Sequence, residues 1–263
     1  MKFLTFKNIR ILFLLSLLAS IAIYAQDQKL NTLYWYQPIP VVIYPINGDD
    51  SAETAQYIQT LSANDFNDID TFFAKHAKKY QLIVQNPTTT SLGKTIGSAP
   101  PPPPEDRNNK FKVASWSLKL RYWTYMNTPD DISNKNRIRL YVLYHQGKEN
   151  EALEHSLGLQ KGLIGIIHAY ATPEQNRQNS IIMAHEILHT VGATDKYDYS
   201  TNQPIYPHGY AKPERSPLFP QRYAEIMAGR LPLSETKAKM PRDLRFCTIG
   251  TQTAREINWI ETQ

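Results

Sequence analysis

Residues 181–195 read IIMAHEILHTVGATD, and this stretch decides how the rest of the chain is interpreted. Apolar residues at positions 181, 184, 188 and 191 recur at helical spacing and predict one face against a core. Isoleucines at 182 and 187 extend the apolar surface, so we expect a helix buried nearly all round. Asn179 or Ser180 is suited to cap its start, and Gly192 is suited to end it in a left-handed conformation.

Two histidines and a glutamate lie inside this apolar helix. His185 and His189 are four residues apart, which puts both imidazoles on one helix face, about 6 Å apart along the axis. Both rings then reach one zinc ion at about 2.0–2.1 Å. Glu186 points beside the metal, where it can accept a proton from a water that the metal activates. This HExxH spacing therefore predicts a zinc site with Glu186 as general base.

A catalytic zinc ion needs a third protein ligand and an open coordination position. Gly192 allows the chain to reverse direction after the helix, so that Asp195 can return to the metal and bind it through a carboxylate oxygen. Glu225 and His208 remain alternative third ligands, with Glu225 ranked ahead of His208. Cysteine zinc clusters are excluded, because Cys247 is the only cysteine in the chain.

The run from His185 to Asp195 resembles the elongated metzincin motif, HExxHxxGxx followed by His or Asp. Its aspartate variant resembles that of the snapalysin-type neutral proteases of bacteria. The sequence AEIMAG at residues 224–229 is similar to the Met-turn of that group, with Met227 as the methionine packed beneath the metal. Tyr197 matches a tyrosine of the group and could donate a hydrogen bond to the tetrahedral oxyanion.

This resemblance implies an α+β (mixed α/β), metzincin-like zincin fold. A twisted mixed sheet would lie over a central active-site helix, followed by the Met-turn and a C-terminal helix. Residues 162–171 would then form the edge strand on which an extended peptide pairs. We expect His168 in that strand to be structural or to line the cleft rather than to bind the metal.

Outside the motif, strands separated by helices in the first half also favour a mixed α/β sheet. Strands are predicted at residues 38–46, 82–84 and 137–144, and a helix at residues 51–80, with a break near Asn64. The aromatic-rich residues 111–126 are predicted to form a helix, with an extended conformation as the alternative. The strand at 137–144 alternates basic or aromatic with aliphatic residues, which predicts one solvated face. Residues 86–109 include five consecutive prolines and predict a flexible loop.

The first 25 residues have the composition of a secretory signal peptide. Three basic residues precede an apolar run at residues 11–24, and cleavage after Ala25 would leave residues 26–263 as a single catalytic domain. The run is shorter than the roughly 20 residues that a membrane helix needs, although an uncleaved anchor remains the alternative. We expect an exported protein, periplasmic or extracellular, with no stable membrane insertion once the signal is removed.

The charge of the chain depends on that segment. The formal net charge is +5, and removal of three basic residues and no acidic ones lowers it to +2. No basic stripe remains, so a nucleic-acid partner is not expected. Hydrophobic residues make up 41% of the 263 residues and charged residues 20%, which is ordinary for a globular protein.

These features predict an exported zinc endopeptidase that hydrolyses a protein or peptide substrate, with Zn²⁺ as its cofactor. Two alternatives stay open. One is an envelope zinc protein with a non-proteolytic binding role, and the other is a zinc amidase that acts on cell-wall peptides. The intact Glu186 favours an enzyme, because a purely structural zinc site does not need a base.

Overall fold

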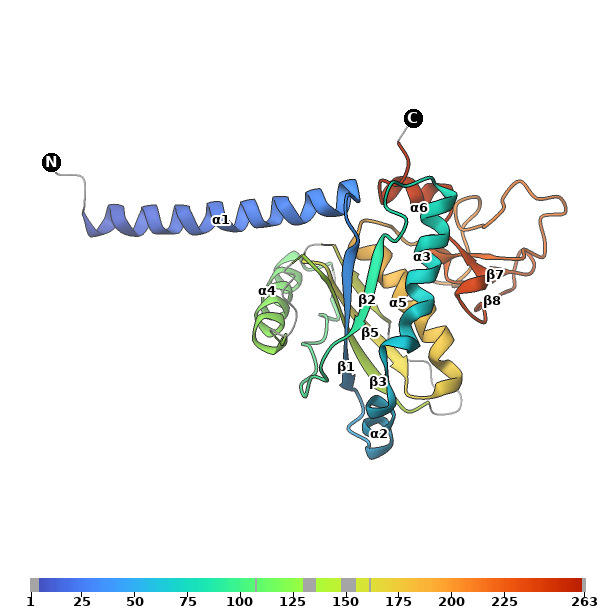
Figure 1. The fold of residues 1–263 in the computed structure, drawn as a ribbon, viewed down its shortest axis with the longest axis horizontal. Helices are drawn as coiled ribbons and strands as arrows, with labels where there is room; N and C mark the ends of the chain where they lie inside the picture. The colour runs from blue at the N-terminus through green and yellow to red at the C-terminus, as the bar shows by residue number, and fades with distance from the viewer. Residues whose placement is uncertain (1–4, 107, 130–135, 148–154, 161, 262–263) are drawn as a thin grey trace.

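A computed structural model describes residues 5–106, 108–129, 136–147, 155–160 and 162–261. Within these ranges the chain forms a five-stranded, mostly parallel sheet and six α-helices. The predicted mixed α/β class is therefore confirmed. Figure 1 shows helices on both sides of the sheet, with α1 extending away from the rest of the molecule.

The central sheet has the strand order β2-β1-β3-β5-β4. Its strands are β1 (Ile39–Asn47), β2 (Thr88–Leu92), β3 (Ile138–His145), β4 (Leu157–Leu159) and β5 (Ile164–Tyr170). The first, second, third and fifth strands run parallel, and β4 runs antiparallel to β5. The sheet thus has one antiparallel edge, next to the strand that precedes the HExxH helix in the sequence.

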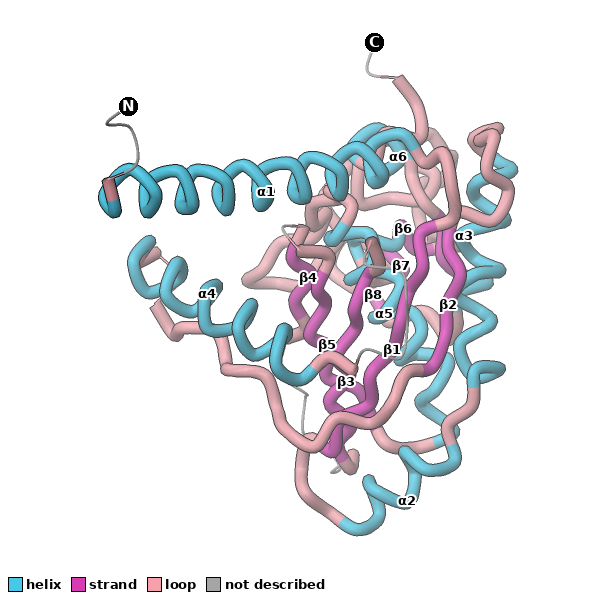
Figure 2. Tube along the Cα trace, turned by 60° about the vertical axis from the view of Figure 1, so that its left-hand side comes forward, coloured by secondary structure: helices cyan, strands magenta, loops and turns pink. Residues whose placement is uncertain are grey.

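Helices cover both faces of this sheet. They are α2 (Ala52–Thr60), α3 (Asn67–Lys79), α4 (Lys110–Asn127), α5 (Asn176–Thr190) and α6 (Thr251–Glu256). Figures 1 and 2 show α4 on one side of the sheet and α3 and α5 on the other. One core cluster includes residues of α2, α3 and α5, and a second, smaller cluster lies between the sheet and α4.

The central strands are buried on both faces. In β1, Val41 and Ile43 belong to the larger cluster, whereas Val42 belongs to the smaller one. In β3, Tyr141 is fully buried and packs edge-on against Trp123 of α4, with ring centroids 4.9 Å apart. The solvated face predicted for residues 137–144 is therefore wrong, because α4 covers it.

The other predicted elements of the first half are largely present. The strand expected at 38–46 is β1, and the helix expected at 111–126 is α4. The expected break near Asn64 is a short 3-10 helix, Ala63–Phe66, between α2 and α3. The interpretation of residues 51–80 as helix with an interruption is therefore confirmed.

The second strand lies in a different place from the predicted one. Residues 82–84 form no strand, and the side chain of Ile83 is 95% exposed. β2 lies instead within the residues predicted to be a loop. Asp70 of α3 accepts hydrogen bonds from the Thr88 hydroxyl at 2.7 Å and from the backbone N–H of Thr90 at 2.7 Å. The proline run at 100–104 is outside helices and strands, as expected.

The edge of the sheet also differs from the prediction. Residues 162–171 contain β5, but this strand pairs with β3 on one side and with β4 on the other. Leu157 of β4 pairs with Ile166, and Leu159 pairs with Ile164. The edge strand on this side of the described sheet is therefore β4, with β2 at the opposite edge, and the three residues of β4 are too few to show a sequence pattern.

The N-terminal segment forms a single helix, α1 (Phe6–Tyr34), which continues through Ala25, the expected cleavage point. Trp35 directly after it is buried, and its indole N–H donates to the carbonyl oxygen of Ile257 at 2.7 Å. Its ring packs edge-on against Trp259. Of the helices in the described part of the chain, none combines the length and the apolar character needed to cross a membrane.

Candidate metal centre

The helix that carries the motif begins earlier than predicted. α5 starts at Asn176, so Asn179 and Ser180 lie inside it and are buried rather than capping it. The Asn179 side chain donates to the carbonyl oxygen of Tyr170 at 2.9 Å and accepts from its N–H at 3.2 Å, which joins α5 to the end of β5. Gly192 follows the helix with a φ of +113°, as the motif predicts.

Three potential ligand atoms converge at the end of α5. The Nε2 atoms of His185 and His189 are 3.0 Å apart, and Oδ1 of Asp195 is 3.1 Å from each of them. Ligands of a tetrahedral zinc ion with bonds of about 2.05 Å are about 3.3 Å from each other. These three residues are the one group in the described ranges whose His, Cys, Asp or Glu atoms could hold a metal ion.

Backbone carbonyls orient both imidazoles for this role. Nδ1 of His185 is 2.9 Å from the carbonyl oxygen of Ile226, and Nδ1 of His189 is 2.8 Å from that of Ala193. Because a carbonyl oxygen only accepts, each Nδ1 carries a proton and donates it. The Nε2 atom of each ring is then the one available to a metal, an arrangement typical of histidine ligands.

The charges of these residues favour the binding of a cation. Burial alone would lower the pKa of His185, but the hydrogen bond with Asp195 and the charge of Glu186 raise this pKa to about 9. Burial also opposes the charge of Asp195, yet hydrogen bonds from His185, His189 and Tyr199 keep the pKa of this carboxyl well below its usual range. A metal ion that binds these residues displaces the proton from between them.

The loop that presents Asp195 is fixed by α6. Glu256 accepts hydrogen bonds from the N–H and the hydroxyl of Thr194, both at 2.9 Å, and from Nζ of Lys196 at 2.7 Å. Lys196 is buried, and its backbone N–H donates to the carbonyl oxygen of Met227 at 3.0 Å. The residues on both sides of Asp195 are therefore fixed, and the sequence near Glu256 carries no signal of this role.

Glu186 is buried beside the three ligands. Its Oε2 atom has no hydrogen-bond partner among the described residues, and burial raises the pKa of its carboxyl group. β4 crosses α5 closely at this point. A Cβ atom on Gly158 would lie 2.6 Å from the carbonyl oxygen of Glu186 and 3.0 Å from Oε2. The strand thus excludes solvent from one side of the carboxylate.

The alternative third ligands lie outside this group. Glu225 caps a 3-10 helix, η3 (Ile226–Ala228), and is fully buried. Its two oxygens accept four hydrogen bonds, from the N–H groups of Met227, Ala228 and Gly250 and from the hydroxyl of Thr253. His208 is exposed and is not part of the group either. Asp195 is therefore the carboxylate that the fold brings to the two histidines.

Met227 lies in η3, fully buried in the same core cluster as the apolar residues of α5. The preceding residue, Ile226, supplies the carbonyl oxygen that orients His185. Gly229 ends the turn with a φ of +67°. The turn that resembles a Met-turn therefore packs against the helix and fixes one of the candidate ligands.

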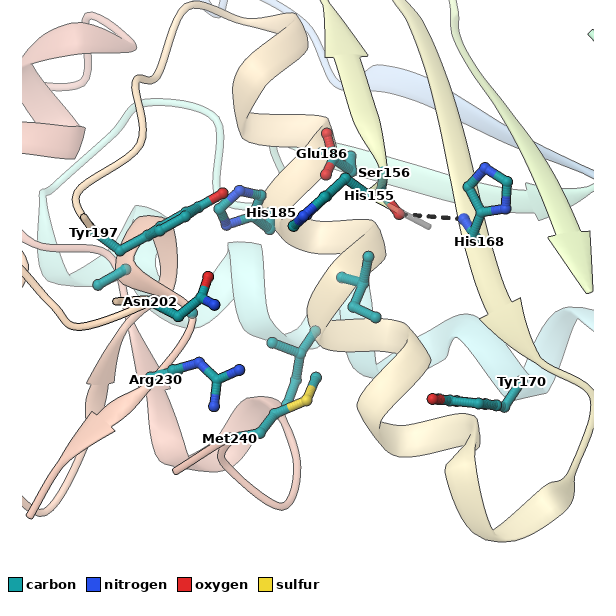
Figure 3. Close-up of a pocket in the computed structure, with 14 residues that line it drawn as sticks. His155, Ser156, His168, Tyr170, His185, Glu186, Tyr197, Asn202, Arg230 and Met240 are labelled. Carbon is teal, nitrogen blue, oxygen red and sulfur yellow. Dashed lines mark hydrogen bonds between the residues drawn. The ribbon is translucent and has the colours of Figure 1, made fainter. Parts of the chain in front are cut away.

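Two tyrosines approach the centre from the loop after Asp195. Tyr197 lines the pocket with its ring centroid 6.5 Å from that of His185, and its hydroxyl end points toward His185 (Figure 3). Burial raises the pKa of Tyr197 to about 12, so the hydroxyl keeps its proton and can donate it. The hydroxyl of Tyr199 donates to Oδ2 of Asp195 at 2.6 Å, a contact that the sequence pattern did not predict.

His185, Glu186 and Tyr197 line one pocket of about 340 Å³, at the lower end of the usual range for ligand sites. Figure 3 shows Tyr197, Asn202, Arg230 and Met240 on one side of α5 and His168 and Tyr170 on the other. His168 thus lines the cleft, as predicted, with its backbone N–H bonded to the Ser156 hydroxyl.

No protein-family model matches this chain, and no curated protein matches its sequence. The metzincin resemblance therefore stays a prediction that rests on residues 181–229 and on the geometry described above.

Proposed function

We propose that this protein is an exported, zinc-dependent endopeptidase of the metzincin type. The observation that carries the proposal is the convergence of Nε2 of His185, Nε2 of His189 and Oδ1 of Asp195 beside the buried Oε2 of Glu186. A cluster that only stabilised the fold would not need a neighbouring carboxylate with one oxygen free of hydrogen bonds, because such an oxygen costs free energy when buried.

The donor set fits zinc. Two imidazole nitrogens and one carboxylate oxygen are common zinc ligands, and three protein ligands are typical of catalytic rather than structural sites. A zinc ion held by His185, His189 and Asp195 would polarise the scissile carbonyl and lower the pKa of a water in its open position to about 7. The carbonyls of Ile226 and Ala193 would keep the two rings in the required tautomer.

Glu186 is the proton carrier in this proposal. Its Oε2 accepts a proton from the attacking water and then delivers it to the nitrogen of the leaving amine. Burial raises the pKa of this carboxyl group, which stabilises the protonated form between the two transfers. The Tyr197 hydroxyl donates a hydrogen bond to the carbonyl oxygen as negative charge develops on it.

An extended peptide would pair with β4. This strand is one of the two edges of the described sheet, its residues are only partly buried, and Gly158 in its centre lies next to Glu186. Edge strands bind peptides by adding a further strand through main-chain hydrogen bonds. We therefore assign to β4 the substrate-pairing role that the resemblance had suggested for residues 162–171.

The decisive experiment is mass-spectrometric digestion of a complex peptide library by the zinc-loaded protein, with the Glu186→Ala variant as control. New internal cleavages from the wild type alone are expected. Zinc is measured in both proteins, with a stoichiometry of one expected in each. Equal products from both proteins, with zinc bound in both, would refute the endopeptidase proposal and favour a zinc protein that acts by binding.

Product analysis separates the endopeptidase from the amidase. A peptidase releases fragments by hydrolysis of bonds within the polypeptide chain, whereas an amidase would leave the library intact and release peptides from cell-wall fragments. Asp195→Ala and Glu225→Ala separate the third ligands. Zinc affinity should fall much further in Asp195→Ala than in Glu225→Ala, provided both variants are shown to be folded.

A further inference from the structure

A short β-hairpin builds the wall of the pocket below the candidate metal centre. β7 (Leu231–Pro232) and β8 (Ala238–Lys239) are antiparallel, with Leu231 opposite Lys239. Arg230 directly precedes β7 and Met240 directly follows β8, so the two residues lie side by side at the open end of the hairpin. Both line the pocket, and Figure 3 shows them on the same side of α5 as Asn202.

Arg230 brings an unpaired positive charge into this pocket. It is partly buried and has no hydrogen bond or ion pair with any residue of the described ranges. It is the one lysine or arginine among the lining residues, and Glu186 is the one acidic residue among them. Glu186 is buried on α5 and is needed there as a base, so the arginine faces the pocket without a counterion from the wall.

Part of the wall around Arg230 is apolar, although Asn202 and Tyr197 lie on the same side of α5. Ile181 and Ile182 of α5, Ala228 and Met240 line the same pocket. A guanidinium group presents several N–H donors in a planar fork that matches a carboxylate, and it stays charged at any relevant pH. The pocket thus combines apolar contact for methylene groups with one site for a carboxylate.

We propose that Arg230 determines specificity by binding a substrate carboxylate in this pocket, that of a glutamate or aspartate side chain close to the scissile bond. This inference rests on the proposed peptidase function. A free C-terminal carboxylate offers the same chemistry and is distinguished by the experiment below. Charge-assisted hydrogen bonds of this kind are shorter and stronger than neutral ones.

The first test compares cleavage of matched peptides by the zinc-loaded protein. The peptides are acetylated and amidated, and each pair differs only in Glu against Gln, scanned through the four positions on either side of a cleaved bond. The wild type should favour Glu at one position by roughly tenfold to a hundredfold in kcat/KM. Arg230→Gln should lose this preference while it still cleaves the Gln peptides, and Arg230→Glu should favour Lys there.

Arg222→Gln is the matched control, because Arg222 is exposed and does not line the pocket. It should retain the wild-type preference and melting temperature. A third set of peptides has no acidic side chain but a free C-terminal carboxylate. If cleavage of only these peptides depends on Arg230, the proposed side-chain specificity is wrong, and the site binds the C-terminal carboxylate of a peptide.

A binding measurement separates this inference from the proposed function. Fluorescence anisotropy of dye-labelled Glu and Gln peptides is measured with zinc-loaded Glu186→Ala, with and without Arg230→Gln. Weaker binding of the Glu peptide on loss of Arg230 supports the inference even if the wild type cleaves nothing. Cleavage or binding with no Glu preference at any position, or a preference that survives Arg230→Gln, overturns it.

Discussion

Glu186 in the pocket and Glu225 at the junction of η3 with residues 247–253 are both buried, with 5% and 0% of their surfaces exposed. Their surroundings differ. Glu225 accepts four hydrogen bonds, whereas Oε2 of Glu186 has no partner among the described residues. A buried carboxylate with a complete set of donors stabilises a fold, and one with a free oxygen is available for chemistry.

The histidines of the two regions follow the same rule. At the junction, His76 of α3 is buried with Nδ1 2.9 Å from the carbonyl oxygen of Phe72 and Nε2 3.1 Å from the Thr248 hydroxyl. In the pocket, the Nε2 atoms of His185 and His189 lie against each other and against Asp195. The polar groups of the junction bond to one another, whereas those of the candidate centre are arranged so that they could hold a metal ion.

The largest expected effect comes from Glu186→Gln. We expect kcat/KM to fall by about 10²- to 10⁴-fold, because the amide cannot accept the proton. The free energy of unfolding should stay the same or rise, since the variant removes a buried charge whose desolvation costs free energy. Peptide cleavage and urea unfolding are measured on one preparation, and a loss of bound zinc would contradict the assignment of Glu186 as base.

Unlike Glu186→Gln, the variant Glu225→Ala should lower the stability of the fold. Removal of this carboxylate leaves buried N–H groups and the Thr253 hydroxyl without an acceptor, so the free energy of unfolding should fall by about 3 kcal/mol or more. Glu225→Gln keeps one acceptor oxygen, so its free energy of unfolding should fall by less. Urea unfolding gives both values. Equal losses of stability in the Ala variants of Glu186 and Glu225 would remove the distinction between the two regions.

The third prediction concerns pH. Burial lowers the pKa of His76 from 6.5 to about 4, so the unfolded chain binds more protons than the folded one between these values. Stability should therefore be complete above about pH 6.5 and fall as the pH drops toward 4, by on the order of 2–3 kcal/mol. Urea unfolding across this range tests it. His76→Phe should flatten this part of the profile, and an unchanged slope would contradict the assignment.

The smallest effect is expected for Glu256→Gln, which weakens the contacts on both sides of Asp195. Zinc affinity should fall about tenfold, the lower limit for residues that support metal ligands. Competition with a chelator measures the affinity, and Glu261→Gln, an exposed change nearby, is the control. A fall in melting temperature with no change in zinc affinity would show that Glu256 serves the fold but not the site.

The sequence predicted the parts that depend on local spacing. A helix fixes the separation of His185 and His189 by its own geometry, and Gly192 marks its end, so three ligands followed from one short stretch. β1 and α4 were likewise visible as an apolar run and a helical composition. The class of the fold was predictable because strands and helices alternate in the first half.

The rest depends on tertiary contacts. β2 is rich in threonine and serine, and it is held by Asp70 rather than by an apolar pattern. Asparagine is a common helix cap, but the side chain of Asn179 is hydrogen-bonded to the end of β5 instead. Glu256 contacts the Asp195 loop, and Arg230 reaches the pocket, across long sequence separations, so no local signal could reveal either placement.

The contacts of residues 250–259 also set an order of events during synthesis. Gly250 and Thr253 complete the surroundings of Glu225, Glu256 fixes the Asp195 loop, and Trp259 packs on Trp35. A domain generally folds as a unit during synthesis. The Asp195 loop and the turn behind it therefore gain these supports only after residue 259 has emerged, so incomplete chains lack a finished candidate metal centre.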